Sequence, residues 1–346
     1  MSGRAKKTLY HIITVLCLCA AFTACFLMAY SVYLERGELL YTLCSVLFFL
    51  AICLLVSPAV LVHECGHLFF GACVGLKPVA VRVGWLVIEG RKVRLSFSAA
   101  AGETVLLPKD AKNVRRRMFV ATLGGGIFNF IFGIIFSVLF FVLPANPILL
   151  FFELFAPLHL YEGIAALLPA QLPAGRTDGE LLRQLKENTP QAQIFCNVLT
   201  VQGILKRNTF DSVEEALLFD VPVVREDDEA FLSLLHLRWQ YLMWKGDTAR
   251  AGKELYRLEE LSEYLDEVSA AKVKCDAFFM RRIVEGAAGI DFAVPAEAEG
   301  SVEGLRARIA LGNGNKEEYK KRTAQESAAG VRALESTIFE RFIQNF

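Results

Sequence analysis

Residues Leu39–Leu76 read LLYTLCSVLFFLAICLLVSPAVLVHECGHLFFGACVGL, and this stretch decides the fold of the chain. Apart from cysteines and one tyrosine, its only ionisable side chains are His63, Glu64 and His67. As one straight helix the stretch would extend about 57 Å, far more than the roughly 30 Å of hydrocarbon in a bilayer. We therefore predict a membrane helix kinked at Pro58, with the pentapeptide HECGH near one membrane face or in a partly sheltered cavity.

The pentapeptide HECGH has the ligand spacing of a metal site. On a helix, His63 and His67 are four residues apart and project from one face, as two imidazoles that bind one metal ion must. Glu64 is rotated by one residue from His63, so it can reach a water molecule on the metal without being a ligand. Ionisable groups in membrane segments cost several kcal/mol and by default have a function. The alternative, a chance HExxH in a helix, is the weaker interpretation in this apolar setting.

The composition is that of a membrane protein. Hydrophobic residues make up 54% of the 346 residues, and the mean hydropathy is +0.40. The formal net charge is zero, and no block of charged residues indicates nucleic-acid binding. The nine cysteines include no CxxC pair, so neither a disulfide framework nor a cysteine zinc site is predicted.

Four apolar runs are long enough to cross a membrane as helices. They cover about His11–Leu34, Leu39–Leu76, Met118–Leu143 and Pro147–Pro169. Lys and Arg are concentrated at the N-terminus and in residues 77–117, which hold ten of them, whereas the loops between the other ends of the runs contain only Arg36. Basic loops remain in the cytoplasm, so we predict a multi-pass protein of the cell membrane with both termini cytoplasmic.

Residues 77–117 have the composition of strands. Val79–Val83, Trp85–Glu89 and Val93–Phe97 are β-prone, and Gly84 and Gly90 separate them. This pattern predicts a small sheet at the membrane surface, whose edge could pair with an extended peptide. The alternative is a basic loop that only sets the membrane topology.

From about Glu180 the chain becomes polar and mainly helical. Glu229–Tyr264 predicts two helices joined at Gly246-Asp247, and Val302–Ile338 predicts a second pair that is interrupted near residues 312–314. Gly286–Gly300 is expected to be a connecting loop. The spacing is similar to that of tetratricopeptide hairpins, but no clean 34-residue repeat is present, so a plain helical bundle is an equal alternative.

The predicted fold class is therefore an α-helical polytopic membrane protein. It comprises a four-span bundle, a small surface β element and a C-terminal soluble α-helical domain. The predicted domains are an N-terminal membrane anchor at 1–38, a core at 39–185 that carries the metal motif, and a cytoplasmic helical domain at 186–346.

A catalytic zinc site needs a third protein ligand besides two histidines. The fourth run contains Glu153, His159 and Glu162, and Asp178 follows that run. Glu162 and His159 are expected to lie deeper in the membrane than His67. Asp178 follows a stretch broken by prolines that can fold back toward a protein-lined cavity. We expect Asp178 to be the third ligand, and Glu162 is the alternative.

These residues resemble the site-2 protease family of intramembrane zinc metalloproteases. That family combines HExxH in a membrane helix, a glycine-rich motif ending in Asn on a later helix, and a DG motif near the last core helix. The corresponding segments here are HECGH at His63–His67, GGGIFN at Gly124–Asn129 and ALLPAQLPAGRTDG at Ala166–Gly179. The resemblance covers roughly Leu39–Leu185. It departs at Gly126, where the family usually has Pro, at Ala166, where it often has Asn, and in the longer spacing before Asp178.

The resemblance implies one Zn²⁺ per chain, bound by His63, His67 and Asp178. It implies that Glu64 is the catalytic base and that Asn129 helps to organise the substrate or the oxyanion. The implied reaction is hydrolysis of peptide bonds in or near transmembrane segments, toward the cytoplasmic face. The partners would be a membrane-protein or membrane-peptide substrate and the lipid bilayer, with a protein partner for the C-terminal helical domain as a further hypothesis and no nucleic acid.

Two other functions remain open on the sequence. One is a catalytically idle membrane scaffold of the same fold that binds membrane proteins. The other is a metal carrier that would use Glu153, His159 and Glu162 along a path through the membrane. The intact HExxH together with Asp178 favours the protease.

Overall fold

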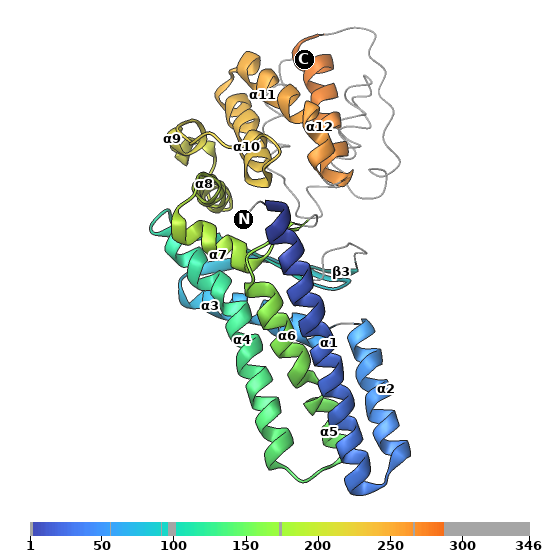
Figure 1. Ribbon diagram of the computed structural model, residues 1–346. Coiled ribbons are helices and arrows are strands. Elements are labelled where there is room, and N and C mark those ends of the chain that lie inside the picture. Colours follow the sequence, from blue (N-terminus) through green and yellow to red (C-terminus); the bar gives the residue numbers. More distant parts are fainter. Residues whose placement is uncertain are drawn as a thin grey trace. The chain divides into compact units, whose positions relative to one another are not determined.

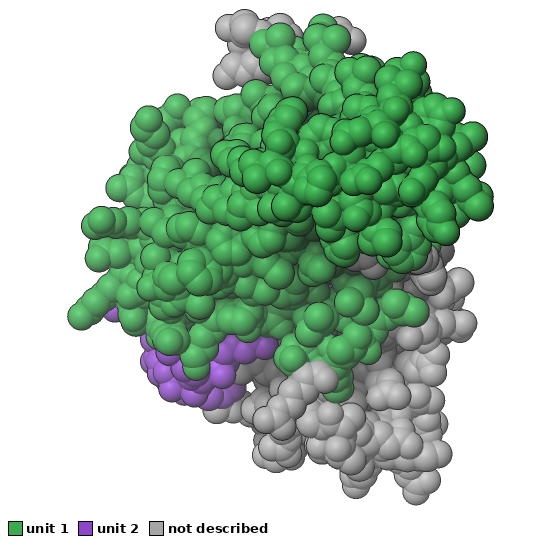
Figure 2. Space-filling view, turned by 90° about the horizontal axis from the view of Figure 1, so that it is seen from below, with its two compact units in different colours: residues 1–192 green, residues 193–346 purple. Residues whose placement is uncertain are grey.

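The computed structural model describes residues 3–55, 57–90, 92–95, 102–172, 175–265 and 267–286. The described chain is mostly helical with a small sheet (Figure 1). It divides into two compact units, Met1–Ala192 and Gln193–Phe346, which Figure 2 shows in different colours. The helical pair predicted at Val302–Ile338 lies outside the described residues. The predicted boundaries at 38/39 and 185/186 remain predictions.

Seven helices of the described chain belong to the first unit. They are α1 (Gly3–Arg36), α2 (Leu39–Leu55), α3 (Pro58–Cys73), α4 (Val114–Val142), α5 (Pro147–Glu153), α6 (Phe155–Leu167) and α7 (Asp178–Glu187). In Figure 1, α1 lies beside α6 and α2, and α4 packs against both α3 and α6. Helix α3, which carries the HECGH motif, also packs against α6.

Three helical stretches are long and apolar enough to cross a membrane, namely Thr8–Arg36, Val114–Val142 and Pro147–Leu167. The pair Leu39–Cys53 and Pro58–Cys73 passes the same test together but is bent by 51°. Proline lacks a backbone donor and disfavours helix at the preceding residue, so the break before Pro58 follows from the sequence. The described chain therefore has three to four candidate spans, at the positions of the four predicted apolar runs.

The surface of the bundle is suited to lipid. On α4, large apolar side chains such as Ile134, Phe141 and Val142 are exposed. A contiguous apolar surface of this kind on a soluble monomer would promote aggregation, whereas in a bilayer it needs no further partner.

A small sheet is present, as predicted, and in the described residues it has one strand more than predicted. Its strands are β1 (Leu76–Val83), β2 (Leu86–Glu89), β3 (Lys92–Leu95) and β4 (Gly102–Pro108), all antiparallel, in the order β3-β2-β1-β4. Gly84 and Gly90 adopt positive φ at the two turns, which glycine does without strain. Strand β4 was not predicted. Three consecutive residues at its end are buried, so it lacks the alternation of apolar and polar residues that marks a half-buried strand.

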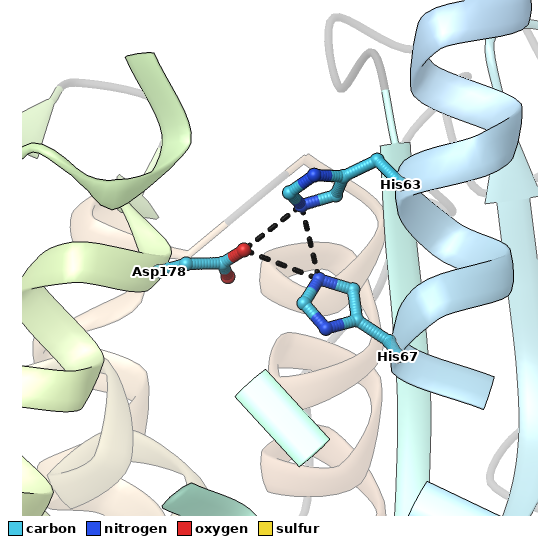
Figure 3. Close-up of side chains that lie close together, drawn as sticks. All are labelled: His63, His67 and Asp178. Carbon is cyan, nitrogen blue, oxygen red and sulfur yellow. Dashed lines mark hydrogen bonds and ion pairs between the residues drawn. The ribbon is translucent and has the colours of Figure 1, made fainter. Parts of the chain in front are cut away.

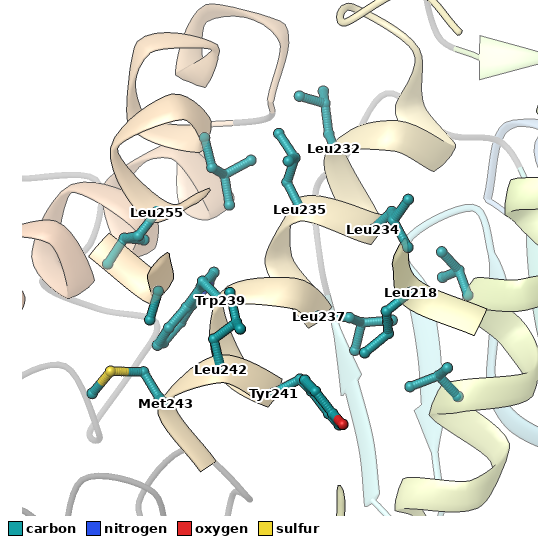
Figure 4. Packing of buried hydrophobic residues seen from close by; sticks show 14 of the residues in the cluster. Leu218, Leu232, Leu234, Leu235, Leu237, Trp239, Tyr241, Leu242, Met243 and Leu255 are labelled. Atoms are coloured by element: carbon teal, nitrogen blue, oxygen red, sulfur yellow. The ribbon is translucent and has the colours of Figure 1, made fainter. Parts of the chain in front are cut away.

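The second unit is built around the pair α10 (Glu229–Lys245) and α11 (Thr248–Glu260). Gly246 ends α10 with a φ of 82°, and the Asp247 side chain accepts a hydrogen bond from the Arg250 amide, so the predicted turn between two helices is confirmed. Trp239, Leu242 and Leu255 are among the buried side chains that fill its core (Figure 4).

Shorter or flanking helical elements complete the described part of this unit. They are α8 (Pro190–Leu205), which begins just before the unit boundary, η1 (Phe210–Ser212), α9 (Ala216–Phe219), η2 (Ser262–Tyr264), α12 (Glu267–Phe279) and the π-helix η3 (Met280–Val284). Helix α12 packs against α11. A tetratricopeptide-like organisation of the tail remains a prediction.

Candidate metal centre

Three side chains from two helices converge on one point (Figure 3). The Nε2 atom of His63 lies 2.8 Å from Oδ2 of Asp178, and Nε2 of His67 lies 3.2 Å from the same oxygen. The two Nε2 atoms are 3.1 Å apart. Asp178 follows the two histidines by more than 100 residues in sequence. Helix α3 and the first residue of α7 thus bring the predicted ligands together.

The three donor atoms fit a zinc ion. Ligand atoms bound at about 2.0–2.1 Å to a tetrahedral zinc lie about 3.3 Å from one another, close to the observed separations. Two imidazoles and one carboxylate are also a known donor set for catalytic zinc, which keeps its fourth position open. Among the described residues, no other group of His, Cys, Asp or Glu meets the same spacing.

The ring of His67 is fixed for binding through Nε2. Its Nδ1 lies 2.9 Å from the backbone oxygen of Ala121 on α4. A carbonyl oxygen only accepts hydrogen bonds, so Nδ1 carries a proton and Nε2 is the ring nitrogen left to bind a metal. The ring is buried, and this bond holds it in the orientation that faces Asp178.

Asp178 is positioned by the residues on either side of it. The hydroxyl of Thr177 donates to the backbone oxygen of Leu168 at 2.7 Å and accepts from the amide of Glu180 at 3.3 Å, so Thr177 caps α7 and ties it to the end of α6. A Cβ at Gly179 would lie 2.1 Å from the backbone oxygen of Leu167. The DG pair therefore combines a ligand with a residue that permits close approach.

Asp178 is held in its ionised form. Burial raises the pKa of this carboxyl, but hydrogen bonds from the His63 and His67 rings, together with their charge, outweigh burial and lower it below its usual value. A carboxylate must be deprotonated to bind a metal, so the surroundings favour the ligand form.

Glu64 lies beside the three converging side chains and not among them. Its carboxylate is buried, and Thr104 of β4 donates to Oε2 at 2.5 Å. A Cβ at Gly102 would lie 2.3 Å from Oε1, so the backbone of β4 passes directly over the carboxylate. The sequence analysis missed both β4 residues because no local signal connects a strand to a helix forty residues away.

Asn129 lies behind His63. Its amide nitrogen is 3.1 Å from Nδ1 of His63, and its amide oxygen is 3.0 Å from Nδ1 of His159. Asn129 is fully buried, so in this structure its contacts are with the two imidazoles. His159, flagged in the sequence as an ionisable residue within a span, does not reach the point where the three donor atoms meet.

The glycine run of α4 makes room for the site. A Cβ at Gly125 would lie 2.6 Å from Nε2 of His63, and one at Gly124 would lie 2.6 Å from the backbone oxygen of Gly66. A Cβ at Gly126 would lie 2.7 Å from the side chain of Leu167. Each glycine of the run therefore permits a different close contact.

The model of peptidase family M50 matches residues 49–335. The chain belongs to peptidase family M50. This match confirms the resemblance to the site-2 proteases, which are zinc-dependent metalloproteases of membranes. No curated protein and no solved structure matches the chain. The family accounts for the apolar helices of this M50 chain and for a donor set that can hold a metal.

Replacing Gly125 with Ala should remove zinc from this M50 protein. The added Cβ falls on the His63 nitrogen that faces Asp178, and an α4 backbone fixed by its own hydrogen bonds cannot retreat. The measurement is zinc content per chain after purification in detergent. Ile134→Ala, at an exposed position of the same helix, is the matched control and should keep its zinc. Full zinc occupancy in the Gly125 variant would contradict the geometry.

Loss of a residue that only contacts a metal ligand weakens metal binding roughly 10–100-fold. Asp178 is a proposed ligand itself, so replacing it with Ala should weaken zinc binding by more than that. Glu162→Gln should leave zinc affinity nearly unchanged, because Glu162 lies outside the group of converging donor atoms. Competition with a chromogenic chelator measures both constants. If the Glu162 variant lost zinc and the Asp178 variant kept it, the third ligand would be Glu162.

Proposed function

We propose that the chain is an intramembrane zinc metalloprotease that hydrolyses peptide bonds in or near transmembrane segments of membrane proteins, toward the cytoplasmic face. One observation carries the proposal: His63, His67 and Asp178 converge with the spacing of zinc ligands, and the carboxylate of Glu64 lies beside them. Membership of family M50 supports the same reaction.

In this proposal His63, His67 and Asp178 hold one zinc ion per chain. Zinc bound there supplies a Lewis acid that activates water and polarises a peptide carbonyl. Glu64 takes a proton from the attacking water and passes it to the leaving amine. The hydrogen bond from Thr104 to Oε2 helps to hold the carboxylate of Glu64 in place.

The substrate must present an unwound backbone. The carbonyls of a membrane helix are satisfied by internal hydrogen bonds, so a scissile bond becomes accessible only where the helix opens. We propose that the opened segment pairs with β4, because β4 lies against Glu64 and is an outer strand of the described sheet. The strands β1 to β3, which the sequence favoured for this role, then support β4.

The proposed topology has four spans, with both termini, the sheet and α7 on the cytoplasmic side. The distribution of Lys and Arg supports it, because residues 77–117 hold ten of them. All candidate ligands precede Pro190, so we propose that the tail recruits a protein partner or regulates the enzyme. The lipid bilayer and a membrane-protein substrate are the remaining partners.

The two alternative functions have less support. An idle scaffold would have no need of a complete ligand set and a buried carboxylate beside it, and both are present. A metal carrier would need donors that converge along a path. Glu153, His159 and Glu162 form no group of close donor atoms among the described residues, and His159 is engaged by Asn129.

Replacing Glu64 with Gln should abolish proteolysis while zinc stays bound, because the residue accepts a proton and is not a ligand. The assay is cleavage of single-span membrane proteins of the host, reconstituted with the enzyme in liposomes, with zinc content measured on the same samples. Cys65→Ala, at an exposed position next to Glu64, is the control and should cleave normally. Undiminished cleavage by the Glu64→Gln variant, or loss of its zinc, would refute the assignment.

The topology predicts that a cysteine at Gly37 reacts with a membrane-impermeant thiol reagent in intact cells and that a cysteine at Asn313 does not. The native cysteines are first replaced, and permeabilised cells serve as the control in which both sites react. If only the cysteine at position 313 were labelled in intact cells, the orientation would be inverted.

A further inference from the structure

A buried chain of hydrogen-bonding groups runs from His159 on α6 through Asn129 on α4 to His63 on α3. The two distances are 3.0 Å and 3.1 Å. His159 is 1% exposed and Asn129 0% exposed, so neither can exchange its partner for water. Across each of these two contacts a donor must face an acceptor, because two donors or two acceptors placed together in a buried site are costly.

Zinc binding decides which atom of His63 carries the proton. The Nε2 atom of His63 faces Asp178 and His67, so the metal would take the lone pair of Nε2. A neutral imidazole then has its single proton on Nδ1, which becomes a donor. The Asn129 amide faces Nδ1 of His63 and must accept its hydrogen bond. The only acceptor on the Asn129 side chain is the amide oxygen.

Zinc therefore also fixes the orientation of the Asn129 amide. In the structure the amide nitrogen faces His63 and the oxygen faces His159, the arrangement that suits a His63 ring with its proton on Nε2. A half-turn of the amide exchanges two atoms of similar size and leaves both contacts near 3 Å. After that half-turn the oxygen accepts from His63, and the nitrogen needs an acceptor on the other side.

His159 is that acceptor. When the amide oxygen of Asn129 faces His63, the amide nitrogen donates to Nδ1 of His159. That Nδ1 must then hold a lone pair, so the proton of His159 is on Nε2 and the ring is neutral. The rings of Phe132 and Phe136 pack against His159, with centroids 5.9 Å and 5.8 Å away. Burial away from water disfavours the charged imidazolium, in which Nδ1 carries a proton and cannot accept. The neutral ring with its proton on Nε2 is the form whose Nδ1 accepts.

We propose that His159 is a positioning residue for the metal centre. Its Nδ1 accepts from the Asn129 amide, which keeps the amide oxygen on the Nδ1–H of His63 and so presents the Nε2 lone pair of His63 to zinc. The inference rests on the proposed zinc site, and it gives Asn129 a role in holding a ligand.

The test is the zinc affinity of three variants in the full-length protein in detergent. His159→Phe keeps an aromatic ring and removes the acceptor, so it should weaken zinc binding about 10–100-fold. His159→Asn can place an oxygen near the position of Nδ1, and it should recover most of that loss. Phe136→Leu disturbs the packing of the same ring without removing the hydrogen bond, and it should bind zinc like the wild type.

Each outcome decides the question. If His159→Phe bound zinc as tightly as the wild type, if His159→Asn gave no recovery, or if Phe136→Leu weakened zinc as much as His159→Phe, the positioning role would be wrong. A wild-type protein that bound no zinc would instead refute the proposed function itself.

A measurement on the wild type covers the case in which a variant does not fold. In zinc-loaded protein with ¹⁵N-labelled histidine, NMR should show His159 protonated on Nε2 and unprotonated on Nδ1, and His63 protonated on Nδ1. A His159 ring with its proton on Nδ1 would overturn the proposal without any substitution.

Discussion

The direct backbone contact between α3 and α4 is the constraint on which the metal centre depends. At Gly66 and Gly124 neither helix has a side chain, and a Cβ on either would overlap the backbone oxygen of the other. Because the two helices touch here, the carbonyl of Ala121 reaches His67 and the amide of Asn129 reaches His63. A separation larger by one methyl group would remove both contacts, so the small residues here set the geometry of the candidate site as well as the packing.

The second requirement is that every polar group of the site finds a partner away from water. His67 is paired with a carbonyl, His63 with an amide, Glu64 with a hydroxyl and Asp178 with the two rings. Each partner comes from a different element than the residue it holds. The polar network therefore fixes the mutual position of α3, α4, α7 and β4, because moving any of them would leave a buried group unpaired. Fold and site are stabilised by the same contacts.

The sequence predicted those features that are encoded locally. The HExxH spacing, the break at Pro58, the turn at Gly246-Asp247 and most of the sheet all follow from neighbours within a few residues. Asp178 was expected as a ligand because topology and the family motif placed it near the histidines. The convergence of Asp178 with His63 and His67 is a property of the structure.

Features that depend on contacts between distant elements could not be predicted in the same way. Nothing near Thr104 or Gly102 in sequence indicates that β4 lies on Glu64. His159 carried a signal, since an ionisable group within a span requires a reason, but its partner could be found only in three dimensions. The family resemblance implied a substrate or oxyanion role for Asn129, whereas the structure places its amide between two imidazoles.

Two of the three departures from the site-2 protease pattern, Gly126 and Ala166, lie at or next to one contact. Gly126, where that family usually has Pro, lies against Leu167, and Ala166 precedes Leu167 at the end of α6. Leu167 and Leu168 are in turn the residues that receive Gly179 and Thr177 at the start of α7. A small residue at 126 allows the end of α6 to approach α4 closely, and that end carries the segment which leads to Asp178. Gly126 therefore acts on the placement of the third donor through Leu167, which contacts both Gly126 and Gly179.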